Sequence, residues 1–75
     1  MPYEIYQFRV KGYLDPERSD WFDGLTISHN EQGESILLGS IADQAALFGI
    51  LVKIRDTGLP LLEVRRGANN HETEH

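Results

Sequence analysis

The sequence contains no cysteine, which excludes disulfide bridges and thiolate metal sites. Only three histidines occur among the 75 residues, and two of them lie in the polar C-terminal segment, so we expect no metal site and no metal cofactor. Small domains usually gain stability from disulfides, a metal or oligomerisation. With the first two excluded, the sequence favours oligomerisation or unusually good packing.

Basic residues are also few, seven Lys and Arg against twelve Asp and Glu, which gives a net charge of −5. A nucleic-acid-binding protein normally presents a basic surface that releases counterions from phosphate, so we expect no nucleic-acid partner. Apolar runs stay far below the roughly 20 residues of a membrane span. The chain enters a strand-like segment directly after Met1-Pro2-Tyr3, without the pattern of a signal peptide. These features predict a cytoplasmic protein without membrane association.

Motifs that bind phosphates or carry a nucleophile are missing from the sequence. The glycines stand singly at turn positions, and there is no G-x-G-x-x-G, P-loop or G-x-S-x-G pattern. We therefore assign no catalytic residue and no cofactor. Forty per cent apolar and 25% charged residues are typical of a globular chain, and the length suits one domain. We place that domain at residues 1–66 and interpret 67–75 as a polar flexible tail.

The first half of the chain has the pattern of strands and turns. Apolar and polar residues alternate from 3 to 14, which is typical of a half-buried strand. Asp15-Pro16 then predicts a turn or a single helical turn. A second strand is predicted over 22–29 and a third over 35–39, with a hairpin turn between them at 30–33, where Gly33 supplies a positive φ.

One long helix follows the third strand. Ser40-Ile41-Ala42-Asp43 has the form of a capping box, which predicts Ser40 as the N-cap and Asp43 as its partner. The helix is expected to run to 56 or 57, where Gly58 ends it in a left-handed conformation. Residues 61–66 form the last predicted strand.

These elements predict an α+β fold of βββαβ order, with one helix packed on a four-stranded mixed sheet. Strands 35–39 and 61–66 are connected through the helix, so we expect them to be parallel with a right-handed crossover. The hairpin makes the second and third strands antiparallel. The consecutive apolar residues Ile36, Leu37 and Leu38 favour burial on both faces or a central position in the sheet.

The helix has more apolar surface than one sheet needs. One stripe at helical spacing is its core face: Leu47, Ile50, Leu51 and Ile54. A second stripe lies beside it, accompanied by a small residue: Ile41, Ala45, Phe48, Val52 and Gly49. In one interpretation the helix is buried between the sheet and the 15–21 loop. In the other, which we favour, the second stripe contacts a second copy of the chain around a two-fold axis. The uncovered sheet face, with Tyr3, Ile5 and Tyr13, is a rival dimer surface.

The segment 19–24 is the most site-like stretch. It places the two carboxylates Asp20 and Asp23 around Trp21, the only tryptophan, at a loop-to-strand junction. If the carboxylates converged, one could act as a general base, and these three residues are the candidate ligand-binding residues. We favour the simpler interpretation, in which Trp21 and Phe22 anchor the loop and the acidic residues serve backbone turns.

Two segments carry a resemblance to known sequences, SDWFDGLTIS at 19–28 and DQAALFGILVKIRDTGLPLLEVRR at 43–66. They resemble an uncharacterised family of short bacterial and archaeal proteins with a D-Q-A-A-L-x-G-x-L-x-K-I-R-D-x-G-L-P-L-L core. The resemblance implies no activity, substrate or cofactor.

We therefore expect a small self-associating interaction module without catalytic activity, a homodimer that binds a protein or small-molecule partner. The alternative is a small dimeric enzyme or small-molecule sensor with a pocket near the 19–23 loop or at the dimer seam. An enzyme site needs a concave pocket with convergent polar groups, whereas an interaction module shows a filled core and an exposed apolar patch.

Overall fold

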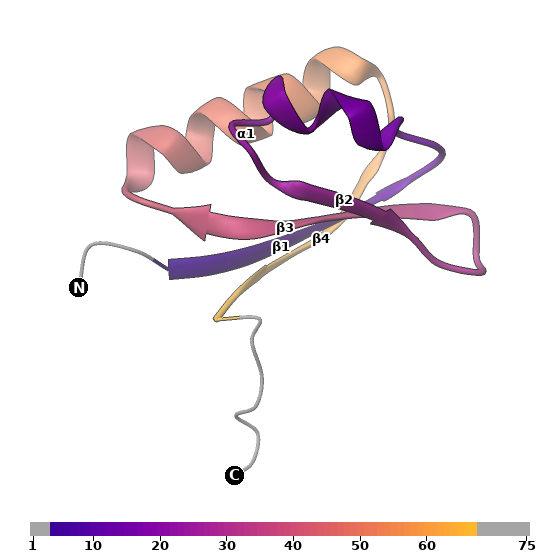
Figure 1. Cartoon of the computed structure of the whole chain (residues 1–75), viewed down its shortest axis with the longest axis horizontal. Coiled ribbons are helices and arrows are strands. Elements are labelled where there is room, and N and C mark those ends of the chain that lie inside the picture. The colour runs from indigo at the N-terminus through magenta and orange to yellow at the C-terminus, as the bar shows by residue number, and fades with distance from the viewer. Residues whose placement is uncertain (1–3, 68–75) are drawn as a thin grey trace, which may run out of the picture.

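The N-terminal strand lies inside the sheet, and both helices cover one face of it. The computed structural model describes residues 4–67. Four strands are ordered β2-β3-β1-β4: β1 Glu4–Lys11, β2 Thr26–His29, β3 Glu34–Ile41 and β4 Leu61–Arg66. The short 3-10 helix η1 (Pro16–Asp20) precedes β2, and the helix α1 (Gln44–Thr57) connects β3 to β4. Figure 1 shows η1 and α1 on the same side of the sheet.

All strand pairs in the described chain are antiparallel, so the predicted mixed sheet is wrong. β3 and β4 do run in the same direction, but β1 lies between them and pairs antiparallel to both. A helical connection fixes the relative direction of two strands and leaves their adjacency open. The α+β class, with one long helix on a four-stranded sheet, is confirmed.

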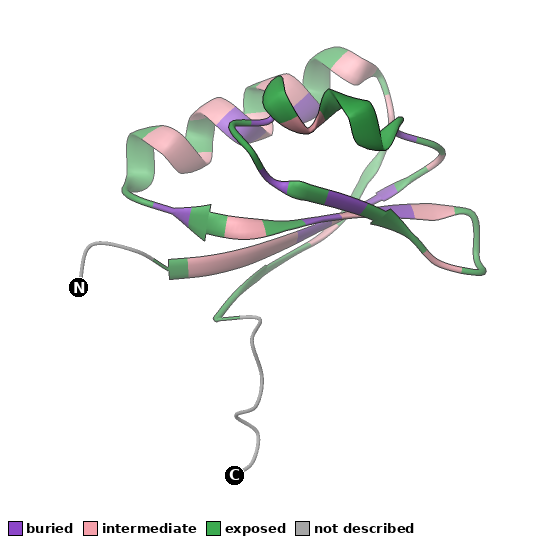
Figure 2. Cartoon of the chain, in the orientation of Figure 1, coloured by how far each residue is buried: buried purple, intermediate pink, exposed green. Residues whose placement is uncertain are grey.

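The alternation predicted for the first strand is confirmed in β1. Phe8 and Val10 are fully buried on the helix-bearing face, whereas Arg9 and Lys11 belong to the opposite face. The core is made by ten apolar side chains: Phe8, Val10, Leu14, Phe22, Leu25, Ile27, Leu37, Ile41, Ile50 and Ile54. Figure 2 shows that the buried positions lie on the strands, on α1 and in the loops on either side of η1.

β3 has the central position that was one of two alternatives for its apolar run, between β2 and β1, but its residues are not buried on both faces. Leu37 is buried in the core, but the neighbouring Leu38 is 39% exposed. Alternate residues of a strand point to opposite faces. No described element covers the second face of the sheet, so Leu38 meets solvent there.

Residues 22–25, predicted to be the start of the second strand, belong to the loop before β2. β2 begins at Thr26 instead of 22, because residues 16–20 form η1 and Asp23-Gly24 turn the chain with positive φ values of 60° and 85°. Asp15 caps η1 by accepting a hydrogen bond from the Glu17 backbone N–H at 3.0 Å, as the predicted helical turn requires.

The N-cap of α1 is Asp43, and the prediction of Ser40 is wrong. Ser40 still pairs with Ile5 in the β1–β3 ladder, so it is not free to start the helix. Asp43 has extended backbone angles, and its carboxylate accepts from the Ala46 backbone N–H at 2.8 Å. The predicted C-terminus is confirmed, since Gly58 has a φ of 80° and its N–H donates to the Arg55 carbonyl at 3.0 Å.

The core face of α1 is confirmed in its centre, where Ile50 and Ile54 are fully buried and Leu47 and Leu51 are half-buried against the core. Ile41, assigned to the interface stripe from the sequence, ends β3 and is buried in the core, so that assignment is wrong. The last strand, Leu61–Arg66, has the predicted bounds. Of the predicted tail at 67–75, all but Gly67 lies outside the described residues.

Candidate functional site

A hollow of about 470 Å³ lies between η1 and the C-terminal end of α1. Its wall includes Tyr13, Arg18, Trp21 and Asp56. Trp21 caps the C-terminal end of η1 and is 40% exposed, while the adjacent Phe22 is fully buried. The two rings meet edge to face with centroids 4.7 Å apart. Phe22 therefore anchors the loop, as predicted, and Trp21 lies at the surface of the hollow.

The hollow is lined by aromatic rings, by the cation of Arg18 and by the carboxylate of Asp56, which pairs with Arg55. The Arg18 guanidinium carbon lies 5.9 Å from the Trp21 ring centroid, within the range of a cation–π contact. Tyr13 stacks on His29 with centroids 4.6 Å apart, and a ring nitrogen of His29 lies 2.7 Å from the Leu14 carbonyl oxygen. Within residues 4–67, Arg18 has no carboxylate partner. This arrangement suits a planar, negatively charged group.

The two carboxylates of the predicted site differ in their contacts. Asp23 forms an ion pair with Lys53 of α1, with 3.3 Å between the carboxylate oxygen and Nζ. Asp20 ends η1, is exposed, and its carboxylate has no hydrogen-bond or ion-pair partner in the described part of the chain. Of the three predicted residues, only Trp21 lines the hollow. Residues 4–67 also contain no cluster of three potential metal ligands.

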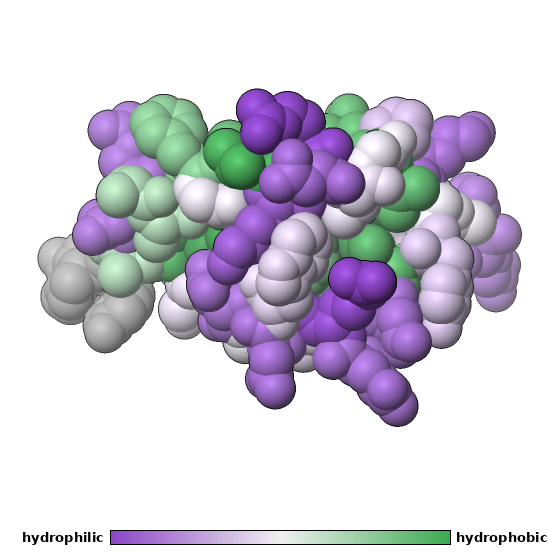
Figure 3. All heavy atoms as spheres, turned by 90° about the horizontal axis from the view of Figure 1, so that it is seen from above, coloured by the Kyte–Doolittle hydropathy of each residue, from purple (hydrophilic) through white to green (hydrophobic). Residues whose placement is uncertain are grey.

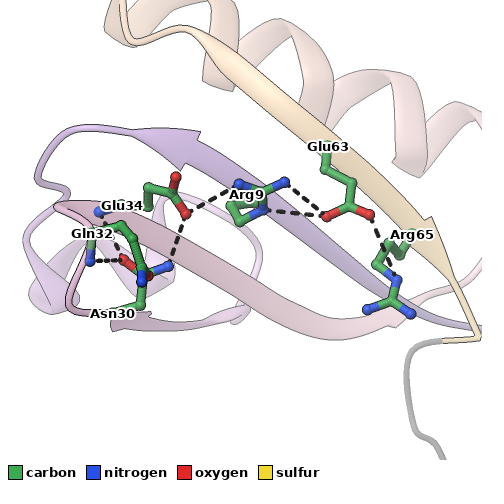
Figure 4. A network of polar contacts seen from close by, with 6 residues as sticks. All are labelled: Arg9, Asn30, Gln32, Glu34, Glu63 and Arg65. Carbon is green, nitrogen blue, oxygen red and sulfur yellow. Dashed lines mark hydrogen bonds and ion pairs between the residues drawn. The ribbon is translucent and has the colours of Figure 1, made fainter.

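The uncovered face of the sheet carries an ion-pair network centred on Arg9 of β1 (Figure 4). The Arg9 guanidinium donates to Glu63 of β4 through Nε and Nη2 at 3.2 and 3.1 Å, and to Glu34 of β3 through Nη1 at 3.1 Å. Asn30 donates to the same Glu34 oxygen at 2.8 Å, and Arg65 Nε lies 3.8 Å from the second oxygen of Glu63. The network links three strands side by side.

Hydrogen bonds in this network change the acidity of its members. Donation from Asn30, followed by donation from Arg9, lowers the pKa of Glu34 below its ordinary value. Hydrogen bonds to Glu34 and Glu63 raise the pKa of Arg9. Both residues remain charged at neutral pH, so this part of the uncovered face is polar. Such a surface is a poor candidate for the rival dimer interface. Ile5 of that surface is half-buried, Tyr13 stacks on His29, and Tyr3 lies outside the described residues.

Exposed apolar side chains gather on α1 and β4. On α1, Phe48 is 54% and Val52 44% exposed. On β4, three side chains are each 41% exposed: Leu61, Leu62 and Val64. Figure 3 views the helix-bearing side and shows apolar side chains clustered at the left, where α1 begins. We call the surface formed by Leu47, Phe48, Leu51 and Val64 the β4-side surface.

The two flanks of α1 differ in what lies beside them. Lys53 reaches Asp23, so its flank faces the η1 loop. Leu47 lines a second hollow, of about 220 Å³, together with Tyr6 of β1 and Arg66 of β4. Leu51 follows Leu47 by four residues and shares its flank. The Leu47–Leu51 flank therefore lies on the β4 side, where no further described element covers it.

Two features of the surface were not predicted from the sequence. The Arg9 network depends on strand adjacency, since Glu34 and Glu63 are distant in sequence and meet only because β1 lies between β3 and β4. The apolar surface of β4 could have been noticed in the sequence, because Leu61, Leu62 and Val64 follow the helix and precede a polar segment. That signal becomes meaningful only when β4 is known to be an edge strand.

The chain belongs to the family described as domain of unknown function DUF8691, whose model matches residues 5–65. Membership in an uncharacterised family agrees with the expectation from the sequence. No curated protein and no solved structure matches the chain. Among the described helices, none has the length and apolar character that crossing a bilayer requires.

Proposed function

We propose that this domain is a self-associating interaction module without catalytic activity, and that its partner in self-association is a second copy of the same chain. The observation that supports this most is the β4-side surface, where Phe48 and Val64 are 54% and 41% exposed on neighbouring elements. Contiguous exposed apolar surface rimmed by polar residues is typical of an interaction site. The opposite face carries the polar Arg9 network, which favours the β4-side surface for association.

The size of the domain supports the same proposal. A chain of about this length buries only roughly 60% of the surface exposed by its unfolded state, so a further buried interface stabilises it appreciably. The sequence has no cysteine for a disulfide, and residues 4–67 form no metal cluster. Oligomerisation is the remaining common source of additional stability.

The interface predicted from the sequence is retained in part. Ala45, Phe48, Gly49 and Val52 all lie on α1 away from the two fully buried positions, Ile50 and Ile54. Phe48 follows Leu47 and precedes Leu51 by three residues, so it borders the β4-side flank. Ala45 and Gly49 precede Lys53 by eight and four residues and therefore border the flank that faces η1. We assign Phe48 to the self-association surface and leave Ala45 and Gly49 outside it.

Sedimentation velocity tests the proposal directly. At micromolar concentrations the chain is expected to sediment as a species of twice 8.5 kDa, with dissociation on dilution. A single species of 8.5 kDa across the micromolar range would contradict self-association.

The second candidate function is a small-molecule sensor, which the aromatic hollow between η1 and α1 favours. Its volume of about 470 Å³ is within the range of ligand sites, and Arg18, Trp21 and Tyr13 suit a planar anionic ligand. Trp21 is the only tryptophan, so its fluorescence reports binding without a label. Titration with a panel of aromatic carboxylates should change that fluorescence, and Arg18→Gln should weaken the response. A response unaffected by Arg18→Gln would exclude this site.

The proposal includes a cytoplasmic location and a protein partner in addition to the second copy. We also propose that the family occurs in bacteria and archaea and that its members share the D-Q-A-A-L-x-G-x-L-x-K-I-R-D-x-G-L-P-L-L core. Pull-down from a native host at endogenous concentration, followed by native mass spectrometry, tests the partner.

A further inference from the structure

β4 is an edge strand whose outer backbone groups are available for pairing. The Gly67 N–H donates to the Ile5 carbonyl at 2.7 Å, which marks that position as a hydrogen-bonded pair of the β1–β4 ladder. Hydrogen-bonded and non-hydrogen-bonded pairs alternate along antiparallel strands. Arg65 opposite Gln7 and Glu63 opposite Arg9 therefore direct their N–H and C=O groups towards β1. The N–H and C=O groups of Val64 and Arg66 consequently point away from the sheet.

The outward groups allow only certain registers for a second β4. Antiparallel pairing around a two-fold axis must join outward-pointing residues of the two copies. An axis at Val64 places Val64 opposite Val64 of the second copy, and Arg66 opposite Leu62. The Leu62 carbonyl also points outward, since the following N–H, that of Glu63, is directed at β1. This register forms hydrogen bonds from each Val64 N–H to the opposite Val64 carbonyl and from each Arg66 N–H to the opposite Leu62 carbonyl.

The charges on β4 favour this register over the two adjacent registers. With the axis at Val64, Glu63 of one copy lies opposite Arg65 of the other, twice, on the face that carries the Arg9 network. Moving the axis to Glu63 places two carboxylates opposite each other, and moving it to Arg65 places two guanidinium groups opposite each other. Like charges directly opposite are destabilising, and opposite charges are stabilising. Within residues 4–67 the Arg65 side chain is 60% exposed and its ion pair with Glu63 is long, at 3.8 Å, so it can turn towards a second copy.

We infer that two copies of this chain join β4 to β4, antiparallel and centred on Val64, to form one continuous sheet of eight strands. The inference rests on the proposed self-association and names its interface. A two-fold axis perpendicular to the sheet keeps both α1 helices on the same face. Val64 pairs with Phe8, which is buried under the helices, so Val64 lies on the same face of the sheet as α1. The two copies of the β4-side surface then face each other across the axis and exclude water from a second apolar layer.

Disulfide trapping tests the register, because the chain has no cysteine and each variant carries a single thiol. Opposite residues in a hydrogen-bonded antiparallel pair have Cα atoms about 5.5 Å apart, which is within disulfide range. Val64→Cys should therefore form a covalent dimer under mild oxidation at least tenfold faster than Ser28→Cys on the exposed part of β2. Ala45→Cys on α1 is a second control and should also be slow.

Substitution of Arg65 tests the charge pairing without removing the Arg9–Glu63 contact. Arg65→Gln removes both Glu63–Arg65 attractions of the β4–β4 pair and should raise the dimer dissociation constant severalfold. Arg65→Glu places a carboxylate opposite Glu63 of the second copy and should raise it further, by at least tenfold relative to the native chain.

The outcomes separate this inference from the proposed function. Rapid trapping of Val64→Cys with weakened association of Arg65→Glu supports the β4 interface. A dimer in which Val64→Cys is trapped no faster than Ser28→Cys overturns the β4 register and leaves self-association standing, and faster trapping of Ala45→Cys moves the interface to the opposite helix flank. A native chain that remains monomeric overturns both.

Discussion

The two edges of the sheet are β2 and β4, and they are protected to different degrees. β2 has four residues, polar side chains at Thr26 and Ser28, and η1 packed beside it. Ser19 of η1 donates to the Leu25 carbonyl at 2.7 Å, just before the strand begins. β4 has six residues, of which Leu61, Leu62 and Val64 are each 41% exposed. Short, polar and covered edges prevent pairing with another chain, whereas long apolar edges favour it.

The difference follows from where the loops go. Residues between β1 and β2 form η1 and insert Phe22 into the core, which closes the side of the sheet next to β2. β4 comes directly after Gly58 and Pro60, so the chain has no comparable described segment to cover its side. The β2 edge is covered by η1 of the same chain, and we propose that the β4 edge is covered by a second copy.

The largest change in stability is expected when η1 loses its anchor beside β2. Phe22→Ala removes a fully buried aromatic ring that holds η1 on the sheet and should lower the free energy of unfolding by about 3–5 kcal/mol. Trp21→Ala, at the half-exposed neighbouring ring, should cost under about 1 kcal/mol. Urea unfolding followed by circular dichroism measures both variants. Equal losses would show that η1 is not anchored through Phe22.

A smaller effect is expected from the polar contact that holds the same loop. The Ser35 hydroxyl is fully buried, donates to the Gly12 carbonyl at 2.7 Å and accepts from the Leu14 N–H at 2.9 Å. Ser35→Ala leaves both backbone groups without this partner and should lower the free energy of unfolding by about 1–3 kcal/mol. Ser28→Ala on exposed β2 is the matched control and should change it by less than about 0.5 kcal/mol. A Ser35→Ala variant as stable as the control would contradict a structural role for the hydroxyl.

The β4 side is tested by Phe48→Asp, which should affect association more than folding. Phe48 is 54% exposed, so the stability of the monomer should change by less than about 1 kcal/mol. The dimer dissociation constant should rise about tenfold, which corresponds to roughly 1.4 kcal/mol. Ala45→Leu, on the other flank, should leave it unchanged. Sedimentation equilibrium measures both variants, and a larger effect of Ala45→Leu would place the interface near η1.

The smallest expected effect is the dependence of stability on pH through Glu34. The pKa of Glu34 is lowered in the folded chain, so the ionised carboxylate contributes stability above its unfolded pKa, and this contribution is lost as pH falls through the folded value. Stability should therefore decrease between neutral and acidic pH. Glu34→Gln should show a weaker decrease over that interval, measured by urea midpoints at each pH. Parallel pH profiles for the two proteins would contradict the assignment to Glu34.

The sequence predicted elements better than their arrangement. The period-two pattern around Phe8, the terminating Gly58 and the closing strand at 61–66 are local signals, and the structure confirms them. The position of β1 between β3 and β4 depends on which strands pair over long distances, which no local pattern records. Asp43 replaced Ser40 as the cap because β3 extends to Ile41, and that extension depends on pairing with β1.

Prediction of the site was limited for the same reason. Trp21 was identified by its surroundings in sequence and does line a hollow, whereas Asp20 and Asp23 do not line it, and Asp23 pairs with Lys53 of α1. Ile41 was placed on the helix stripe and instead belongs to the core of β3. Exposure of Phe48 and Val52 agrees with the expected excess of apolar helix surface.

Amide hydrogen exchange at the two edges tests the central claim most directly. The Asn30 N–H donates to the Glu34 carbonyl, so by alternation the N–H groups of Ile27 and His29 point outward from β2. Measured by NMR at concentrations below and above the dissociation constant, the Val64 and Arg66 amides should become protected as the dimer forms. The Ile27 and His29 amides should exchange at unchanged rates. Concentration-independent exchange at Val64 and Arg66 would contradict the account.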